Sequence, residues 1–273
     1  MKFKFKLVIL YLLTVVLTFS EYNRIVIISP SMFEVACLLG VEDKVVGIGT
    51  LGNTLPYPEN KSCKIEKIGN AFKPSIEKIY SLNPDLIIIK DRVKLPEKEF
   101  LKRGIKVVNY KTRSIDDIFY NFKDFSILVN KEDKAKIIIE RAKEEIEEIK
   151  RTNRKNIKGG IIYSLSPLMI FSDKSLPGEI LDILGIENIG KNLSADKPII
   201  NSEFLLKENP DFLIGTMTIQ TKEEIKKMLP LIEHTKAGKK DNIFIYNAEK
   251  LYINSPRIVE SIKELQLKLE ELE

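Results

Sequence analysis

The first half of the chain alternates short, continuously apolar segments with segments of helical periodicity. Strands are predicted at residues 24–29, 45–50, 85–89 and 106–110, and helices at residues 31–39, 75–82 and 97–103. Ser31 is expected to accept hydrogen bonds at the start of the first helix, and Gly40 to end that helix. Residues 51–71, rich in Gly, Asn and Pro, are expected to form a loop. Such alternation is typical of an α/β fold with a parallel sheet.

After Asn130 the pattern changes to one long, charged helix that reaches residue 151. Its apolar positions recur at steps of three and four residues and are Ile138, Ala142, Ile146 and Ile149. Asn130 is expected to cap this helix, and Asp133 suits the positive end of the helix dipole. A helix of about 20 residues is about 30 Å long. We interpret it as a rigid connector between two lobes, and a solvated coiled-coil segment is the alternative.

The second half of the chain repeats motifs of the first. Its strands are predicted at residues 159–163, 169–172, 212–215 and 243–246, and its helices at residues 178–184 and 257–272. Glu77 lies six residues before Asn83-Pro84-Asp85, and Glu203 lies six residues before Asn209-Pro210-Asp211. Gly40-Val41-Glu42-Asp43 and Gly185-Ile186-Glu187-Asn188 each follow a predicted helix. These repeats indicate two related lobes that arose by duplication.

The predicted architecture is α/β with two pseudo-symmetric lobes, each containing a parallel-type sheet. One long, rigid interlobe helix joins the lobes, and a ligand cleft lies between them. The predicted boundaries are residues 1–20 for a signal peptide, 21–129 for the N-terminal lobe, 130–154 for the interlobe helix and 155–273 for the C-terminal lobe.

Part of the positive charge of the chain lies in its first residues. The net charge is +5, and Lys2, Lys4 and Lys6 precede an apolar run at residues 7–19. This run is shorter than the roughly 20 residues of a membrane-spanning helix, so we interpret it as an export signal, with an uncleaved anchor as the alternative. No Cys follows the run as a lipid acceptor, and a periplasmic location is predicted. Without these three of the 44 basic residues, 41 basic residues face 39 acidic residues, which removes the electrostatic case for nucleic-acid binding.

Few side chains are available for metal binding. His234 is the only imidazole, and Cys37 and Cys63 are the only thiols, which argues against the usual zinc and non-haem iron sites. We predict no catalytic residues, no resident metal and no cofactor. An oxidising compartment permits a disulfide between the two cysteines, and the sequence leaves this pairing open.

Several motifs, taken in order, resemble one protein family. They are residues 24–31 (RIVIISPS) with Glu34, Val45-Val46-Gly47, Lys67-Ile68-Gly69, residues 74–79 (PSIEKI) and Asn83-Pro84-Asp85. Together they look like the N-terminal lobe of the helical-backbone periplasmic binding proteins, which serve ABC importers of iron siderophores, haem and cobalamin. Ser255-Pro256-Arg257-Ile258 and Glu187-Asn188-Ile189 resemble the cobalamin-binding members in particular. The resemblance covers nearly the whole chain after residue 20.

The resemblance implies a function and a partner. The chain would capture an iron chelate (siderophore or haem) or a corrinoid and, as a monomer without enzymatic activity, deliver it to an ABC permease dimer in the cytoplasmic membrane. In this family one acidic residue on each lobe docks onto basic residues of the permease, and Glu77 and Glu203 match these positions. The alternative is a glutamate in the first turn of a helix, where the dipole contributes about 0.3 to 1 kcal/mol.

The ligand is expected to contact loops at the carboxyl ends of strands on both sides of the cleft. The candidates are Tyr57, Phe72 and Arg92 on the first lobe and Met169, Phe171, Met217 and Tyr252 on the second. Aromatic and Met side chains offer apolar contact to a macrocycle, and Arg pairs with anionic oxygens. Arg257 is left open between a structural role and a ligand contact, because a cation at a helix start is unfavourable without a partner.

The identity of the ligand is left open, with an iron chelate favoured. Cobalamin binders commonly use Trp against the corrin, and this chain has no Trp. His234 is expected at the surface, whereas Tyr57 or Tyr252 could ligate haem iron. Two other functions are the alternatives: an exported hydrolase that uses Ser29 or Ser31, although a Gly-x-Ser-x-Gly motif is missing, and an exported interaction domain that binds no small molecule.

Overall fold

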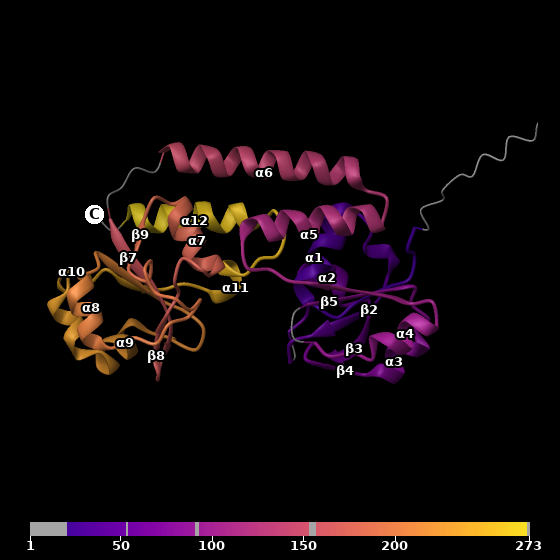
Figure 1. Cartoon of the computed structure of the whole chain (residues 1–273), viewed down its shortest axis with the longest axis horizontal. Coiled ribbons are helices and arrows are strands. Elements are labelled where there is room, and N and C mark those ends of the chain that lie inside the picture. The colour runs from indigo at the N-terminus through magenta and orange to yellow at the C-terminus, as the bar shows by residue number, and fades with distance from the viewer. Residues whose placement is uncertain (1–20, 53, 91–92, 153–156, 272–273) are drawn as a thin grey trace, which may run out of the picture.

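The computed structural model describes residues 21–52, 54–90, 93–152 and 157–271. Two α/β lobes are bridged along one edge by a pair of helices, α5 (Ile115–Leu128) and α6 (Glu132–Thr152) (Figure 1). The predicted signal peptide at residues 1–20 and the candidate ligand contact Arg92 lie outside the described residues. Within the described ranges, no helix combines the length and the apolar character needed to cross a membrane.

The N-terminal lobe is built around the central strand β1 (Ile25–Ile27). Its other strands are β2 (Val45–Thr50), β3 (Glu66–Asn70), β4 (Lys73–Pro74), β5 (Leu86–Lys90) and β6 (Lys106–Tyr110). In the described residues they form a six-stranded sheet of order β4-β3-β2-β1-β5-β6, in which only β4 runs antiparallel to its neighbour. The predicted parallel sheet is therefore present in this lobe.

Helices cover both faces of this sheet, which explains why its central strands are apolar throughout. They are α1 (Pro30–Leu39), α2 (Glu59–Ser62), α3 (Ile76–Ser81), α4 (Glu97–Lys102) and α5, with the 3-10 helix η1 (Glu42–Lys44) after α1. Ile25 and Ile27 belong to a core that includes residues of α1 and α5. Val26 and Ile28 face a second core, which contains Phe100 of α4.

The C-terminal lobe has a smaller sheet. Its strands are β7 (Lys158–Leu165), β8 (Leu168–Ile170), β9 (Glu187–Asn188), β10 (Phe212–Gly215) and β11 (Ile243–Ile245). Its helices are α7 (Leu176–Ile183), α8 (Ser202–Glu208), α9 (Lys222–Met228), α10 (Lys236–Lys239), α11 (Ala248–Leu251) and α12 (Ile258–Glu270), with the 3-10 helix η2 (Pro230–His234). The strand order is β11-β10-β7-β8, with β9 also paired to β7. Only β8 is antiparallel within the described sheet.

The long helix predicted after Asn130 is confirmed as α6. Ala135 packs in the N-terminal core, whereas Ile146 and Ile149 pack in the C-terminal core. Asn130 has a positive φ of 52° and turns the chain between α5 and α6. One helix thus contributes to both hydrophobic cores, as a rigid connector requires.

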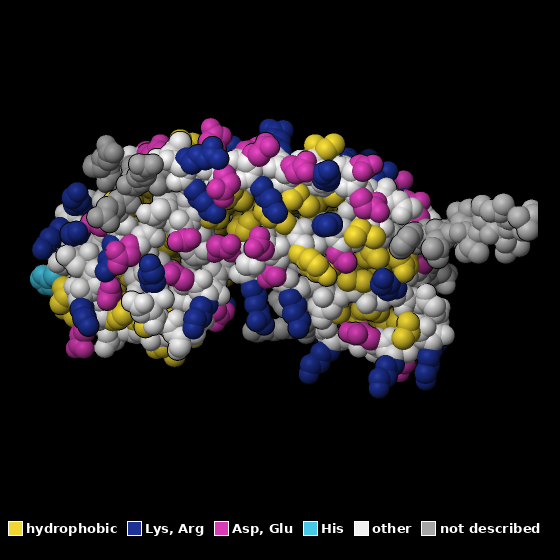
Figure 2. All heavy atoms as spheres, turned by 45° about the horizontal axis from the view of Figure 1, so that its top comes forward, with side chains coloured by type: hydrophobic (Ala, Val, Ile, Leu, Met, Phe, Trp, Pro, Cys, Tyr) yellow, Lys and Arg dark blue, Asp and Glu magenta, His cyan; other side chains and the backbone are white. Residues whose placement is uncertain are grey.

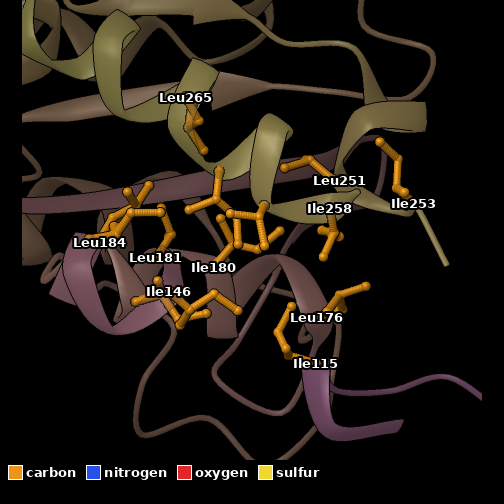
Figure 3. Close-up of a cluster of buried hydrophobic side chains, with 14 of the residues drawn as sticks. Ile115, Ile146, Leu176, Ile180, Leu181, Leu184, Leu251, Ile253, Ile258 and Leu265 are labelled. Atoms are coloured by element: carbon orange, nitrogen blue, oxygen red, sulfur yellow. The ribbon is translucent and has the colours of Figure 1, made fainter. Parts of the chain in front are cut away.

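A second bridging helix, α5, was not predicted from the sequence. Its first turns place Ile115 and Ile118 in the C-terminal core, and its later turns place Phe122 and Phe125 in the N-terminal core. Figure 3 shows Ile115 and Ile146 together with side chains of α7, α11 and α12 in the C-terminal core. The lobes are therefore connected by two helices that both span the junction.

The repeated motifs fold in the same way in both lobes. The carboxylate of Asp85 accepts hydrogen bonds from the backbone N–H groups of Asn23 (2.8 Å) and Arg24 (3.0 Å), just before β1. The carboxylate of Asp211 accepts a hydrogen bond from the N–H of Lys158 (2.8 Å), the first residue of β7. In each lobe the aspartate therefore binds the start of the central strand.

The turns that contain the repeated Asn and Gly residues also match between the lobes. Asn83 and Asn209 have positive φ angles of 45° and 47°. Gly40 and Gly185, which follow α1 and α7, have positive φ angles of 73° and 67°, a conformation that glycine adopts without steric cost. These matches agree with the duplication inferred from the sequence.

Some predictions of local structure were wrong. Residues 51–71 are not only a loop, because they contain α2 and the strand β3. The residues of β3, which lies next to the edge strand β4, are mostly exposed and lack an apolar run. Ser31 lies inside α1, and the N-cap position is Ser29, which makes no side-chain capping bond. The helix expected around Glu203 is present as α8, whereas helices α9 to α11 were not predicted, and each of these has at most seven residues.

Candidate functional site

The space between the lobes is the candidate ligand site, and we call it the cleft. The space-filling view shows the molecule hollowed between the lower parts of the two lobes, with Lys and Arg side chains in the hollow (Figure 2). The strands β5 and β6 end beside this junction, since the chain after Tyr110 crosses to Ile115, whose N–H donates to Glu179 of α7 (2.8 Å). Ligands of α/β sheets bind outside the carboxyl ends of parallel strands, which is the position of the cleft.

Polar contacts join the lobes at the base of the cleft. Nζ of Lys90, the last residue of β5, donates to Oδ1 of Asn254 (2.8 Å). Glu179, which accepts the hydrogen bond from Ile115, is half-buried, and this burial raises the pKa of its carboxyl group. The two lobes are thus in direct contact through hydrogen bonds.

A partly buried ion pair joins α1 to the start of α12. The side chain of Glu34 is only 9% exposed, and its Oε1 accepts from Oγ of Ser255 (2.7 Å) and from Nε of Arg257 (2.6 Å). Oε2 accepts from Nη2 of Arg257 (3.1 Å). The hydrogen bond to Glu34 raises the pKa of Arg257. Arg257, left open by the sequence, therefore has a partner in the other lobe.

Exposed apolar side chains lie in the segments that follow β2 and β3 of the N-terminal lobe. Leu51 follows β2 and Phe72 follows the neighbouring strand β3, and their exposed fractions are 45% and 74%. Tyr57, which precedes α2, is 58% exposed, and its ring centroid lies 4.6 Å from Cζ of Arg257. Tyr57 and Phe72 are thus accessible, and Leu51 is a further candidate that the sequence analysis missed.

Three aromatic rings form a cluster on the C-terminal side. The ring centroids of Tyr163 and Phe171 are 5.5 Å apart, and those of Phe171 and Tyr252 are 6.1 Å apart, both with edge-to-face geometry. Phe171 has no exposed surface, so the structure corrects the prediction of a direct ligand contact: this ring supports the other two from the core. Tyr163, at the end of the predicted strand 159–163, was missed although its position was a usable signal.

Burial raises the pKa of the Tyr252 phenol, with further contributions from Tyr163 and Asp196. Iron ligation by tyrosine uses the phenolate, which a raised pKa disfavours. Tyr252 is therefore better suited to apolar contact than to metal ligation.

A lysine lies against this aromatic cluster. Nζ of Lys197 is 5.4 Å from the ring centroid of Tyr163 and 6.0 Å from that of Phe171, and it pairs with Asp196 at 3.0 Å. The hydrogen bond from Lys197 lowers the pKa of Asp196. No local sequence pattern marked Lys197, because its role depends on packing against a distant strand.

The two candidate methionines lie on the same lobe in different settings. Met169, in β8, forms an isolated backbone bridge with Ile199, whose side chain is 68% exposed. Met217, just after β10, has a positive φ of 60° and packs partly against the C-terminal core. Both are half-buried, and Ile199 is a further exposed apolar candidate that the sequence analysis missed.

The two candidate docking residues occupy equivalent positions. Glu77 is the second residue of α3, after the N-cap Ser75, whose Oγ accepts from the N–H of Lys78 (3.3 Å). Glu203 is the second residue of α8, after the N-cap Asn201, whose Oδ1 accepts from the N–H of residue 204 (2.8 Å). Both carboxylates are exposed at helix N-termini, so the helix dipole stabilises them and leaves them accessible to a partner.

The residues required for hydrolysis are not brought together. Oγ of Ser29 and Oγ of Ser31 are 3.1 Å apart, and in the described ranges neither hydroxyl is hydrogen-bonded to an imidazole. His234 is exposed at the end of η2, and the one imidazole of the chain lies on the outer side of the C-terminal lobe (Figure 2). Across the part of the chain that the structure describes, no group of three or more His, Cys, Asp or Glu side chains is placed to hold a metal.

The two cysteines are not joined to each other. Cys37 is half-buried in α1, and burial, together with the nearby Glu42, raises its pKa to about 11. Cys63 is exposed at the end of α2. The disulfide that the sequence left open is therefore not formed in this structure.

Comparison with known proteins gives a consistent match over both lobes. The family described as "Periplasmic binding protein" matches residues 25–249. The chain is 26% identical over 266 residues to the vitamin B12-binding protein of Vibrio vulnificus strain YJ016, covering 94% of this chain and 93% of that protein. It is 24% identical over 268 residues to the petrobactin-binding protein YclQ of Bacillus subtilis, covering 91% and 83%.

Solved structures share the fold over nearly their whole length. A possible iron-binding (periplasmic solute-binding) protein from Staphylococcus epidermidis matches with a TM-score of 0.82 and 23% identity, covering 91% of this chain and 99% of that chain. The periplasmic heme-binding protein HutB of Vibrio cholerae matches with a TM-score of 0.80 and 16% identity, covering 90% and 98%. The two lobes and their bridging helices are thus a known arrangement.

Proposed function

Since the chain belongs to the periplasmic binding protein family, we propose that it is the extracytoplasmic substrate-binding protein of an ABC importer, which captures a metal chelate in the cleft and delivers it to a membrane permease. The proposal is supported by one observation: Glu77 and Glu203 are the second residues of equivalent helices in the two lobes. Matching carboxylates on two similar lobes suit a partner with two similar subunits, because charge complementarity fixes orientation and speeds encounter.

For the ligand we favour an iron chelate, either a siderophore or haem, over a corrinoid. Relatives of this chain are described as binding vitamin B12, petrobactin and heme, so all three classes occur on this fold. Tyr57, Phe72 and Tyr252 offer broad aromatic contact, and Lys197 adds a cation for an anionic chelate. A haem iron would be ligated by Tyr57 rather than Tyr252, because Tyr57 is exposed and the pKa of Tyr252 is raised.

The remaining parts of the proposal follow from this role. The protein acts without catalysis, as a monomer, after export directed by residues 1–20. Ligand contacts come from both lobes, with Tyr57, Phe72 and Leu51 on one side and Tyr252, Met169 and Ile199 on the other.

Tyrosine fluorescence tests this function directly, because the chain has nine Tyr and no Trp. Haemin, cyanocobalamin and ferric petrobactin are titrated separately, and one class is expected to quench the emission with saturation. At 100 times its dissociation constant, that ligand is expected to stabilise the fold by about 2.7 kcal/mol. If no chelate quenches with saturation or shifts the unfolding transition, the proposed function is wrong.

A matched pair of variants locates the site. Tyr57→Ala is expected to weaken the binding of that ligand, because it removes an exposed aromatic contact in the cleft. Tyr120→Ala removes another exposed ring (68%) from α5 and is expected to leave binding unchanged. Equal effects of the two variants would place the ligand elsewhere.

A further inference from the structure

Arg257 occupies a position that its own helix disfavours. It is the N-cap residue of α12, where the positive end of the helix dipole repels a cation. Within the lobe its nearest acidic contact is Glu260, at 3.5 Å and with 69% of its side chain exposed. Its short hydrogen bonds go to Glu34 of the other lobe. The position is thus explained by a contact between the lobes rather than by the helix.

Glu34 depends on the C-terminal lobe for its hydrogen bonds. The three bonds that its carboxylate accepts come from Ser255 and Arg257, and in the described ranges no side chain of the N-terminal lobe donates to it. A buried carboxylate that loses its partners is strongly unfavourable. The lobes therefore resist any movement that separates Glu34 from Arg257.

The guanidinium of Arg257 also contacts Tyr57, a proposed ligand contact. Its edge binds Glu34, and its Cζ lies 4.6 Å from the ring centroid of Tyr57, a distance typical of a cation–π contact. Both contacts are to the N-terminal lobe, so Arg257 is held there at two points. A shift of one lobe along the other would also displace Arg257 from the Tyr57 ring.

The opposite wall is tied to the same junction. Tyr252 belongs to the aromatic cluster of the C-terminal lobe, and its carbonyl accepts from Nδ2 of Asn254 (2.7 Å). Oδ1 of Asn254 in turn accepts from Lys90 of the N-terminal lobe (2.8 Å). Residues 252–257 thus connect both aromatic walls of the cleft to contacts across the lobes.

We propose that Arg257, held by Glu34, is a positioning residue that sets the width of the cleft and the placement of Tyr57, and thereby selects ligands by size. The effect of Arg257 on the position of the lobes rests on the geometry alone. Its effect on ligand selection also rests on the proposed function. The cleft is then preformed in the ligand-free protein, and a ligand must match the spacing between Tyr57 and Tyr252. Loss of the ion pair makes that spacing variable.

The first test measures the distance between the lobes and needs no ligand. Spin labels are placed at Lys73→Cys and Lys207→Cys, which are exposed on opposite lobes, in a background with Cys37→Ala and Cys63→Ser. One narrow distance distribution is expected for the parent protein. Arg257→Met and the milder Glu34→Gln are expected to broaden it, and Arg257→Lys to broaden it less. An unchanged distribution in both Arg257→Met and Glu34→Gln, with the fold intact, overturns the proposal.

The second test measures selectivity with haemin, cyanocobalamin and ferric petrobactin as probes. Arg257→Met is expected to lower the affinity ratio between the best and the next probe about tenfold, within the range of typical coupling between sites. Lys263→Met, which removes the exposed ion pair between α12 and α6, is the control and is expected to keep the ratio. A variant that loses affinity for all probes equally has only a structural role, and this result overturns the selectivity role of Arg257.

The two tests separate the possible failures. If no probe binds the parent protein, the proposed function fails, while the spin-label distances still decide whether Arg257 holds the lobes. If a probe binds and the distances are unchanged in the variants, the proposed function stands and the role of Arg257 is wrong.

Discussion

The two lobes are alike at the starts of their central strands and at the helices that carry the proposed docking residues, and they differ at the proposed walls of the cleft. Asp85 and Asp211 bind the start of each central strand, and Glu77 and Glu203 are the second residues of equivalent helices. These shared features lie in the repeated motifs of the sequence. The common scaffold has therefore kept the parts that a two-subunit partner would recognise.

The cleft-facing parts have diverged. In the N-terminal sheet, the six-residue strand β2 and then β3 follow on one side of β1. In the C-terminal sheet, β7 is flanked by the two-residue strand β9 and the antiparallel strand β8. The first lobe offers exposed side chains such as Phe72, whereas the second offers half-buried rings such as Tyr252 supported by Phe171. The two similar lobes thus present two unlike walls, which suits a ligand without two-fold symmetry.

The largest expected effect follows from reversing the matched charges. Glu77→Lys combined with Glu203→Lys is expected to lower stimulation of ATP hydrolysis by the cognate permease at least about tenfold, because two attractive contacts become repulsive. Ligand affinity is expected to stay nearly the same, since both residues are exposed outside the cleft walls. The measurement is ATPase activity of the permease in proteoliposomes with each variant.

The control for this experiment carries the same charge change elsewhere. Glu99→Lys on α4 combined with Glu223→Lys on α9 also reverses one exposed carboxylate on each lobe. It is expected to stimulate the permease normally. Normal stimulation by the first double variant would refute the docking role of Glu77 and Glu203.

A large effect on stability is expected from the helices that the lobes share. Phe122→Ala removes a fully buried ring from the N-terminal core and is expected to cost about 3–5 kcal/mol. Ile146→Ala removes a buried aliphatic side chain from the C-terminal core and is expected to cost about 2–5 kcal/mol. Because α5 and α6 belong to both cores, chemical denaturation followed by circular dichroism is expected to show one transition in each variant. Separate transitions for the lobes would contradict this coupling.

A moderate loss of stability is expected when either aspartate that binds the start of a central strand is removed. Asp85→Ala leaves two backbone N–H groups without their acceptor and Asp211→Ala leaves one, so each is expected to destabilise the fold by about 1–3 kcal/mol, with Asp85→Ala the more severe. Asp43→Ala, at an exposed position, serves as the control. Urea midpoints of the three variants provide the test, and a greater loss in Asp211→Ala than in Asp85→Ala would contradict the expected order.

The smallest effect concerns Glu179 at the junction of the lobes. Burial raises the pKa of its carboxyl in the folded state, so the folded protein binds this proton more tightly than the unfolded chain. The stability that this group contributes is therefore lost as the pH rises through the folded pKa. Glu179→Gln is expected to be slightly more stable than the parent at pH 7, with the difference vanishing near pH 4, as judged by urea midpoints. A loss of stability at pH 7 would show that the charged form is needed to accept from Ile115.

Much of the fold could be predicted because local sequence patterns determine its elements. The apolar strands, the charged helix α6 and the repeated motifs are all confirmed. The helix α5 had an equally clear pattern, with apolar residues at Ile115, Ile118 and Phe122 and with Ser114 accepting from the N–H of Asp117 (3.1 Å). The strand β3 had no such pattern, because its only buried apolar residue is Ile68.

The site was less predictable because it depends on contacts between distant segments. Tyr57 and Phe72 lie in loops near strand ends, where exposed aromatic residues can be recognised from the sequence. Phe171 has the same residue type in a similar place, yet the packing of the second lobe buries it. The partner of Arg257 is Glu34, 223 residues earlier, and no local pattern links two positions so far apart.

The helices that cross the junction also decide how this molecule can be divided. A fragment that ends at residue 129 would carry Ile115 and Ile118 with no core to receive them, and a fragment that begins at residue 130 would lack those side chains from its own interior. The two lobes therefore cannot be separated at residue 130 without exposing buried apolar side chains. A chimera that exchanges one lobe with that of a relative would have to transfer α5 and α6 together, with the surfaces that both helices cover.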